Sequence, residues 1–122
     1  GLEWVGGVAD LPQLLKRTDY LFICVPLTSE TRNMINKQEL SLLPKGAFIL
    51  NAARGPIINK EALMKALDSG HLRGVALDVY WKEPPEPKDP ILDYPNVLAT
   101  PHIAGVTDVS DRGITAKVVE NI

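Results

Sequence analysis

The stretch "AFILNAARGPIINKEALMKALDSGHLRGVALDVY", residues 47–80, contains two apolar runs with a helical pattern between them. The runs "AFILNA" (47–52) and "GVALDVY" (74–80) are short and nearly continuous, which is typical of strands that are buried on both faces. Between them, Asn59 is placed to cap a helix and Gly70 to end it. This order predicts a strand–helix–strand unit of an α/β fold.

Other apolar runs extend the pattern on both sides of this unit. We expect strands at "YLFICV" (20–25) and, more weakly, at "NVLAT" (96–100), with "EWVGGV" (3–8) as a fifth. The stretch 82–95 holds five prolines and is predicted to be a loop within one domain. The sequence therefore predicts a parallel sheet whose strands alternate with helices.

Three further helices are predicted from their capping signals. Asp10 with Gln13, and Asn36 with Glu39, have the spacing of a capping box. Thr107 is placed to cap a last helix that runs to the C-terminus.

The composition is typical of a small globular protein and argues against several kinds of partner. The chain has 122 residues, of which 45% are hydrophobic and 23% charged, as in one small globular domain. A net charge of -2 argues against nucleic acid or an anionic membrane as a partner, and no apolar run is long enough to cross a bilayer. There is no signal-peptide pattern near Gly1. The single cysteine, Cys24, is expected in the core, and it favours a reducing, cytoplasmic setting. We predict no metal site.

Polar residues follow three of the predicted strands. Arg54, Asp78 with Glu83, and His102 come where strands end, and carboxyl ends of parallel strands share one edge of a sheet. Arginine can bind a carboxylate through two hydrogen bonds, histidine can transfer a proton, and a glutamate can orient a histidine ring. Each has an ordinary alternative: Arg54 or His102 as a turn residue, and Glu83 as a solvated charge. Asp78 lies in a buried run and needs a partner or a ligand.

Four stretches, in this order, carry a resemblance to a known family. They are "CVPLTSET" (24–31), "GAFILNAARGPIINKEAL" (46–63), "GHLRGVALDVYWKEPP" (70–85) and "DPILDYPNVLATPHIAGVT" (89–107). Together they resemble the D-isomer-specific 2-hydroxyacid dehydrogenase family, which includes phosphoglycerate, glycerate and glyoxylate/hydroxypyruvate dehydrogenases. The resemblance runs from about Gly7 to the C-terminus and implies a Rossmann-type, doubly wound parallel sheet in three α/β/α layers.

The resemblance also implies a site. Arg54, Glu83 and His102 match the family's catalytic set: Arg54 would hold a 2-oxo acid, His102 would protonate its carbonyl oxygen, and Glu83 would orient His102. An NAD or NADP cofactor is implied, with Asp78 on the nicotinamide amide. The implied cofactor contacts are Val25, Pro26, Ala52, Ala53, Arg54, Asp78, His102, Ala104 and Gly105.

The sequence departs from the family pattern near its beginning. None of its nine glycines forms the Gly-x-Gly-x-x-Gly turn, and the acidic residue that follows this turn is missing too. No separate substrate domain is present. We therefore expect residues 1–122 to be the second half of a dinucleotide-binding domain that lacks the first β-α-β unit. In the usual strand order of such domains, residues 3–8 would form the third strand. The strand at 20–25 would then have an open edge, because the strands that lie between the two are absent. We also expect the chain alone to be inactive.

The implied function is hydride transfer between NAD(P)H and a small 2-oxo or D-2-hydroxy acid. The alternative is an NADH-sensing, corepressor-like binding module, because such members of the family keep the same three residues. The resemblance further implies a homodimer in the parent protein. Neither the substrate nor the choice between NAD and NADP follows from this sequence.

Overall fold

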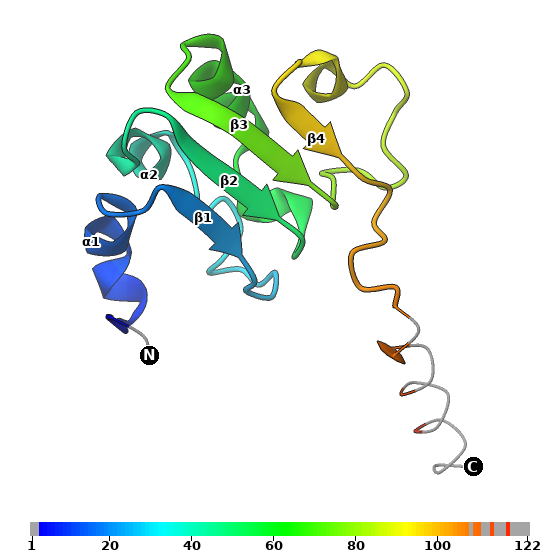
Figure 1. Cartoon of the computed structure of the whole chain (residues 1–122), viewed down its shortest axis with the longest axis horizontal. Helices are drawn as coiled ribbons and strands as arrows, with labels where there is room; N and C mark the ends of the chain where they lie inside the picture. The colour runs from blue at the N-terminus through cyan, green and yellow to red at the C-terminus, as the bar shows by residue number, and fades with distance from the viewer. Residues whose placement is uncertain (1–2, 108, 111–112, 114–116, 118–122) are drawn as a thin grey trace.

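Four parallel strands form one open sheet. The computed structural model describes residues 3–107, 109–110, 113 and 117. Within them the strands follow one another in the order β1-β2-β3-β4, all parallel (Figure 1). Their bounds are Tyr20–Ile23 (β1), Ala47–Asn51 (β2), Leu72–Leu77 (β3) and Val97–Ala99 (β4). The parallel α/β sheet and these four strands are confirmed, with β3 beginning two residues earlier than expected and ending at Leu77.

The helices lie on one face of the sheet. Behind the strands in Figure 1 are α2 and α3, and α1 contacts α2 beside them. Their bounds are Leu11–Leu15 (α1), Lys37–Leu42 (α2) and Lys60–Asp68 (α3), with short 3-10 turns at Val8–Asp10, Gly55–Ile57 and Pro90–Asp93. In the part of the chain that the structure describes, no helix is long and apolar enough to span a bilayer.

Two of the predicted caps are confirmed in atomic detail. The Asn36 amide donates to Glu39 Oε2 at 3.1 Å, and Asn36 Oδ1 accepts from the Lys37 amide at 2.8 Å, so α2 begins with reciprocal bonds. Asn59 Oδ1 accepts from the Ala62 amide at 2.9 Å at the start of α3. Just beyond α3, Gly70 has φ +65°, a left-handed conformation that glycine adopts without a steric penalty.

Two expectations for the N-terminal segment are wrong. Residues 3–8 form no strand; Val8 already begins a 3-10 turn, and the pairing partner of β1 within the described residues is β2 alone. The Asp10–Gln13 capping box is absent because Asp10 has helical angles (φ -91°, ψ -1°), and its carboxylate instead accepts from the Gly7 amide at 2.9 Å.

The last predicted helix lies mostly outside the described residues. Its beginning is described: the Ser110 amide donates to Thr107 Oγ1 at 3.0 Å, and the Thr107 amide donates to Ser110 Oγ at 2.9 Å.

The two faces of the sheet differ sharply in exposure. Leu21 and Ile23 are 7% and 5% exposed under the helices, whereas Tyr20 and Phe22 are 61% and 63% exposed. Burial on both faces is therefore wrong for β1, because every described helix lies on the same side.

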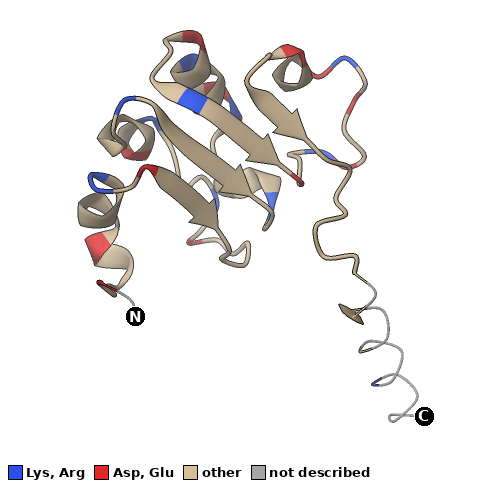
Figure 2. Cartoon of the chain, in the orientation of Figure 1, with Lys and Arg blue, Asp and Glu red and all other residues tan. Residues whose placement is uncertain are grey.

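The opposite side, which we call the outer face, carries Tyr20, Phe22, Phe48, Leu50, Gly74, Ala76 and Leu98. Tyr20 stacks on Phe48 at 5.2 Å between ring centroids. The strands carry few charged residues (Figure 2), so the outer face is mainly apolar; the Arg73 guanidinium lies over the Phe48 ring, 5.9 Å from its centroid. A third layer over it is not formed by the described residues.

This asymmetry makes a quantitative prediction about two adjacent residues. Ile23→Ala should lower the free energy of unfolding by about 2–5 kcal/mol because it leaves a cavity under the helices. Phe22→Ala, on the outer face, should change it by less than about 1 kcal/mol. Denaturant unfolding of both variants of the 122-residue chain, in which the outer face is uncovered, measures the difference. Equal losses would contradict an uncovered outer face.

Candidate active site

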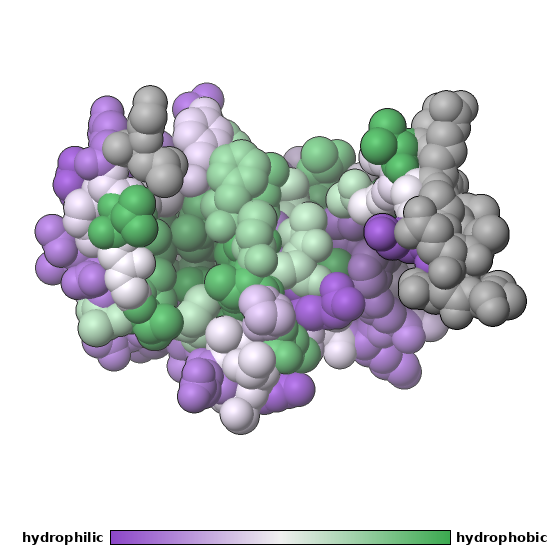
Figure 3. Space-filling model, turned by 90° about the horizontal axis from the view of Figure 1, so that it is seen from below, coloured by the Kyte–Doolittle hydropathy of each residue, from purple (hydrophilic) through white to green (hydrophobic). Residues whose placement is uncertain are grey.

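Every predicted site residue follows the carboxyl end of a strand. Because all strand pairs are parallel, these ends meet at one edge, with Asn51 opposite Leu77 and Leu77 opposite Ala99. The strands point downward in Figure 1, and the view from below in Figure 3 shows apolar residues across the middle with hydrophilic ones around them. The edge thus presents an apolar surface bordered by polar groups.

A buried asparagine shapes the turn that carries Arg54. Asn51 is 1% exposed; its Nδ2 donates to the Arg54 carbonyl at 2.9 Å, and its Oδ1 accepts from the Ala53 amide at 3.0 Å. Ala52 and Arg54 are exposed on this turn, and Arg54 Nη1 donates to the Ala53 carbonyl at 2.6 Å. The turn is therefore fixed from within, while the guanidinium stays accessible.

A cleft lies between the ends of β1 and β2. It has a volume of about 470 Å³ and brings together four predicted residues with two others. The lining residues are Cys24, Val25, Pro26, Leu27, Ala53 and Arg54. The expectation that Cys24 lies in the core is wrong: it is exposed, because β1 ends at Ile23 and the chain leaves the sheet there.

Gly55 brings the Arg54 turn against the segment after β3. A Cβ atom at this position would overlap the backbone carbonyl of Tyr80 and lie 2.6 Å from the Trp81 nitrogen. Only glycine permits this approach. This close approach places Arg54 on the same side as Glu83, which lies three residues after Tyr80 in the sequence.

Glu83 and His102 form a direct pair. Glu83 Oε2 lies 2.8 Å from His102 Nδ1, and Glu83 Oε1 accepts from the Tyr80 amide at 3.0 Å. The Tyr80 amide lowers the pKa of the Glu83 carboxyl, and His102 and the charge of Arg54 lower it further, against a smaller effect of burial. An ionised carboxylate only accepts hydrogen bonds, so His102 Nδ1 carries the proton and Nε2 is left for another partner. Among the described residues, no hydrogen bond or ion pair joins Arg54 to either side chain; Arg54 acts on the pair through its charge.

Asp78 holds the segment after β4. It is 6% exposed, and its carboxylate accepts from Thr100 Oγ1 (2.6 Å), the Ile103 amide (2.9 Å) and the Ala104 amide (2.8 Å). Burial alone would raise the pKa of Asp78, but these bonds and the nearby His102 offset it, and the pKa is lowered. Ala104 thus reaches the site through its amide. Gly105 comes next in the chain, and its carbonyl accepts a hydrogen bond from Ser110 Oγ at 2.8 Å.

Three residues of the site were missed from the sequence. Asn51, Tyr80 and Thr100 hold the segments that carry Arg54, Glu83 and His102; the Tyr80 hydroxyl donates to the Thr100 carbonyl at 2.9 Å. Asn51 could have been noticed, because an amide inside an apolar run needs a buried partner, as Asp78 does. Nothing in the sequence distinguishes Tyr80 or Thr100.

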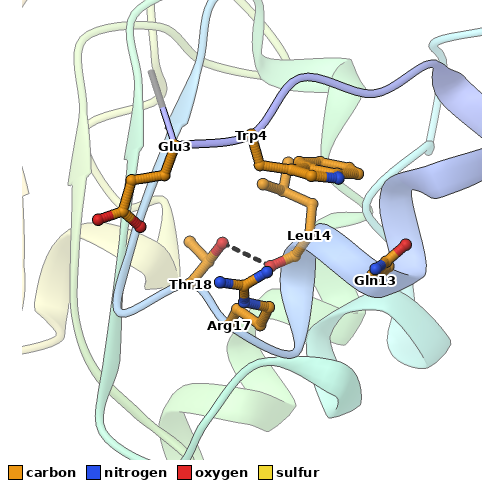
Figure 4. A pocket seen from close by; sticks show the side chains of 6 residues that line it. All are labelled: Glu3, Trp4, Gln13, Leu14, Arg17 and Thr18. Carbon is orange, nitrogen blue, oxygen red and sulfur yellow. Dashed lines mark hydrogen bonds between the residues drawn. The ribbon is translucent and has the colours of Figure 1, made fainter. Parts of the chain in front are cut away.

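A second hollow lies at the other edge of the sheet. Its volume is about 210 Å³, and Figure 4 shows the six residues that line it: Glu3, Trp4, Gln13, Leu14, Arg17 and Thr18. Thr18 precedes β1, so this hollow lies at the amino end of that strand, away from Arg54. Across the residues that the structure describes, no group of three or more His, Cys, Asp or Glu side chains could hold a metal ion.

In open parallel α/β sheets, ligands bind outside the carboxyl ends of the strands, which is where the carboxylate–histidine pair and Arg54 lie. Residues 3–104 match the family model described as D-isomer specific 2-hydroxyacid dehydrogenase, NAD binding domain. The chain therefore belongs to the D-isomer specific 2-hydroxyacid dehydrogenase family, as its motifs had indicated.

Individual relatives agree with this membership. The chain is 46% identical over 98 residues (80% of the chain) to a glyoxylate reductase of Thermofilum pendens, and 40% identical over 115 residues (94%) to a D-3-phosphoglycerate dehydrogenase of Methanocaldococcus jannaschii. A D-isomer specific 2-hydroxyacid dehydrogenase of Xanthobacter autotrophicus Py2, solved with NADPH and MES, superposes with a TM-score of 0.85 at 39% identity over 94% of the chain. The matches cover 29%, 22% and 47% of these three proteins, so the chain spans less than half of each.

The close approach at Gly55 can be tested by adding one methyl group. Gly55→Ala should lower the free energy of unfolding by about 1–3 kcal/mol or more, because neither backbone can move without breaking the turn. Gly7→Ala is the matched control, since its φ is -88° and the nearest atom to an added Cβ is 3.9 Å away. Thermal unfolding measures both. A Gly55→Ala variant as stable as the control would show that the two segments separate freely.

The lowered pKa values predict loss of stability in acid. Asp78 and Glu83 bind protons more weakly in the folded state than at their ordinary values of 3.8 and 4.5, so the unfolded chain takes up more protons as the pH falls through and below this range. The stability that Asp78 and Glu83 contribute is therefore present above this pH range, and it is lost as the pH falls toward their folded-state pKa values. Unfolding experiments from pH 7 to pH 3 should show a shallower acid dependence for Asp78→Asn. An unchanged dependence would contradict the role of Asp78.

Proposed function

We propose that this chain supplies the catalytic half-site of an oxidoreductase that transfers a hydride between NAD(P)H and a small 2-oxo acid, with the D-2-hydroxy acid as the reduced form. The contact between Glu83 and His102 at the strand edge that also carries Arg54 is the observation on which this rests. The named relatives act within this class, as a glyoxylate reductase and a D-3-phosphoglycerate dehydrogenase.

The three side chains divide the work. Arg54 is exposed on a rigid turn, and its planar guanidinium suits the carboxylate of a 2-oxo acid. His102 donates a proton from Nε2 to the substrate carbonyl oxygen and takes it back in the reverse direction. Glu83 accepts a hydrogen bond from Nδ1 of His102 and thereby fixes the tautomer of the ring. Because Glu83 is ionised, its negative charge also stabilises the protonated ring.

The residues present fit the nicotinamide end of the cofactor. The cleft beside Arg54 includes the apolar residues Val25, Pro26, Leu27 and Ala53. Asp78 Oδ2 accepts from the Ala104 amide, its one hydrogen bond within the described residues, and a carboxylate oxygen can accept another. When bound, the nicotinamide supplies the hydride. Ala52, Ala53 and Arg54 would lie beneath it and Asp78 would bond its amide, while Val25 and Pro26 would line the adenosine and ribose side. His102, Ala104 and Gly105 would close the pocket. The 122-residue sequence contains no Gly-x-Gly-x-x-Gly turn for the pyrophosphate.

We also propose that residues 1–122 form the second half of a dinucleotide-binding domain and are inactive by themselves. The apolar outer face and the open edge of β1 support this, since a third layer and further strands would cover them. A homodimer and a cytoplasmic location stay predictions.

The test is turnover by the protein that contains this chain. NADH and NADPH oxidation is followed with glyoxylate, hydroxypyruvate and phosphohydroxypyruvate. His102→Gln should lower kcat by roughly 10²–10⁴-fold, because proton transfer is lost. His71→Gln is the matched control: its Nε2 contacts the Leu40 carbonyl at 3.0 Å between α2 and α3, away from the site.

Three outcomes separate the alternatives. Loss of turnover in His102→Gln alone supports the proposal. Saturable NADH binding without turnover of any 2-oxo acid would contradict it and favour the binding module. Equal loss in both histidine variants would point to a folding defect instead of a catalytic role.

A further inference from the structure

A single buried carboxylate bonds to residues on both sides of His102. Thr100 Oγ1 and the Ile103 amide donate to Asp78 Oδ1, and the Ala104 amide donates to Asp78 Oδ2. These three donors come from the segment that follows β4, and the acceptor comes from the end of β3. The carboxylate therefore ties the histidine segment to the neighbouring strand at three points.

His102 needs such support because its backbone is in an unfavourable conformation. Its φ is +56°, in the left-handed region that residues with a Cβ atom seldom adopt. Such conformations persist where the surroundings determine them. Here the His102 amide also donates to the Thr100 carbonyl at 3.0 Å, so the turn bends back on Thr100 itself.

Thr100 is the residue where these restraints meet. Its amide donates to the Leu77 carbonyl at 2.9 Å, its carbonyl accepts from the Tyr80 hydroxyl at 2.9 Å, and its hydroxyl donates to Asp78. The backbone bonds would survive a change of side chain. Beside the Ile103 and Ala104 amides, the Thr100 hydroxyl is the side-chain donor that the structure places on this carboxylate, and a change of side chain removes it alone.

We propose that Thr100 is a positioning residue: its hydroxyl orients the Asp78 carboxylate, which holds the His102 turn so that Nδ1 meets Glu83 and Nε2 stays free. Thr100 is not a catalytic residue, since it acts only through Asp78 and His102. The effect on turnover rests on the proposed function, whereas the effect on the His102–Glu83 contact does not.

Three variants isolate the hydroxyl. Thr100→Val keeps the shape and removes the donor, and Thr100→Ser keeps the donor and removes the methyl group. Thr18→Val is the remote control, because the Thr18 hydroxyl donates to the Leu14 carbonyl at 2.7 Å at the opposite edge of the sheet (Figure 4). All three are made in the protein that contains this chain.

Two readouts are expected to change together. The hydrogen-bonded Nδ1 proton of His102, observed by ¹⁵N-edited NMR, should be lost in Thr100→Val and retained in Thr100→Ser and Thr18→Val. In turnover, Thr100→Val should lower kcat about 10- to 100-fold, as expected for a hydrogen bond to a charged group, with KM for the 2-oxo acid within about twofold. Thr100→Ser should recover most of kcat.

The proposal is overturned if Thr100→Val keeps the Nδ1 signal, or if Thr100→Ser is as damaging as Thr100→Val. Should Thr100→Val not fold, hydrogen exchange of the unsubstituted protein decides: the Ile103 and Ala104 amides must be protected, and rapid exchange at both would contradict the proposal. A protein that turns over no 2-oxo acid refutes the proposed function, while the NMR and exchange results still decide the role of Thr100.

Discussion

The parallel pairing of β2 with β3 is the constraint on which the site depends. Its register sets Asn51 beside Leu77, so the Arg54 turn and Asp78 leave the sheet next to each other. Gly55 then brings the first segment against Tyr80, and β4 adds the His102 turn from the other side of β3. Arg54 and His102, which are far apart in the sequence, thus reach the same edge of the sheet because the strands place their backbones there.

Buried polar groups give this edge its accuracy. Asn51 and Asp78 are both nearly inaccessible, and each would destabilise the fold if it lost its partners. Their partners are backbone amides and carbonyls of the segments that carry Arg54 and His102. Folding and correct placement of the site are therefore coupled: a turn that moved would leave an unsatisfied amide or carboxylate inside the protein.

The central fold could be predicted because its signals are local. The strand at 47–51, the Asn59 cap and the Gly70 stop each depend on a few neighbouring residues. What failed depends on the rest of the molecule. Apolar residues on both sides of β1 indicate two covered faces, but no described helix lies on the outer face. The segment 3–8 reads as a strand, yet a strand exists only where a neighbour pairs with it.

The same division applies to the site. Arg54, Glu83 and His102 could be found because they follow strand ends, where functional groups gather, and because their spacing follows a family pattern. Asn51 could have been noticed as an amide inside an apolar run, but Tyr80 and Thr100 could not. A hydroxyl is ordinary anywhere, and its role here comes only from the atom that faces it. A sequence shows which groups can react. The residues that hold those groups are recognised only when the structure shows where each hydrogen bond goes. In this chain, Asn51 bonds within the Arg54 turn, Tyr80 to the Thr100 carbonyl and Thr100 to Asp78.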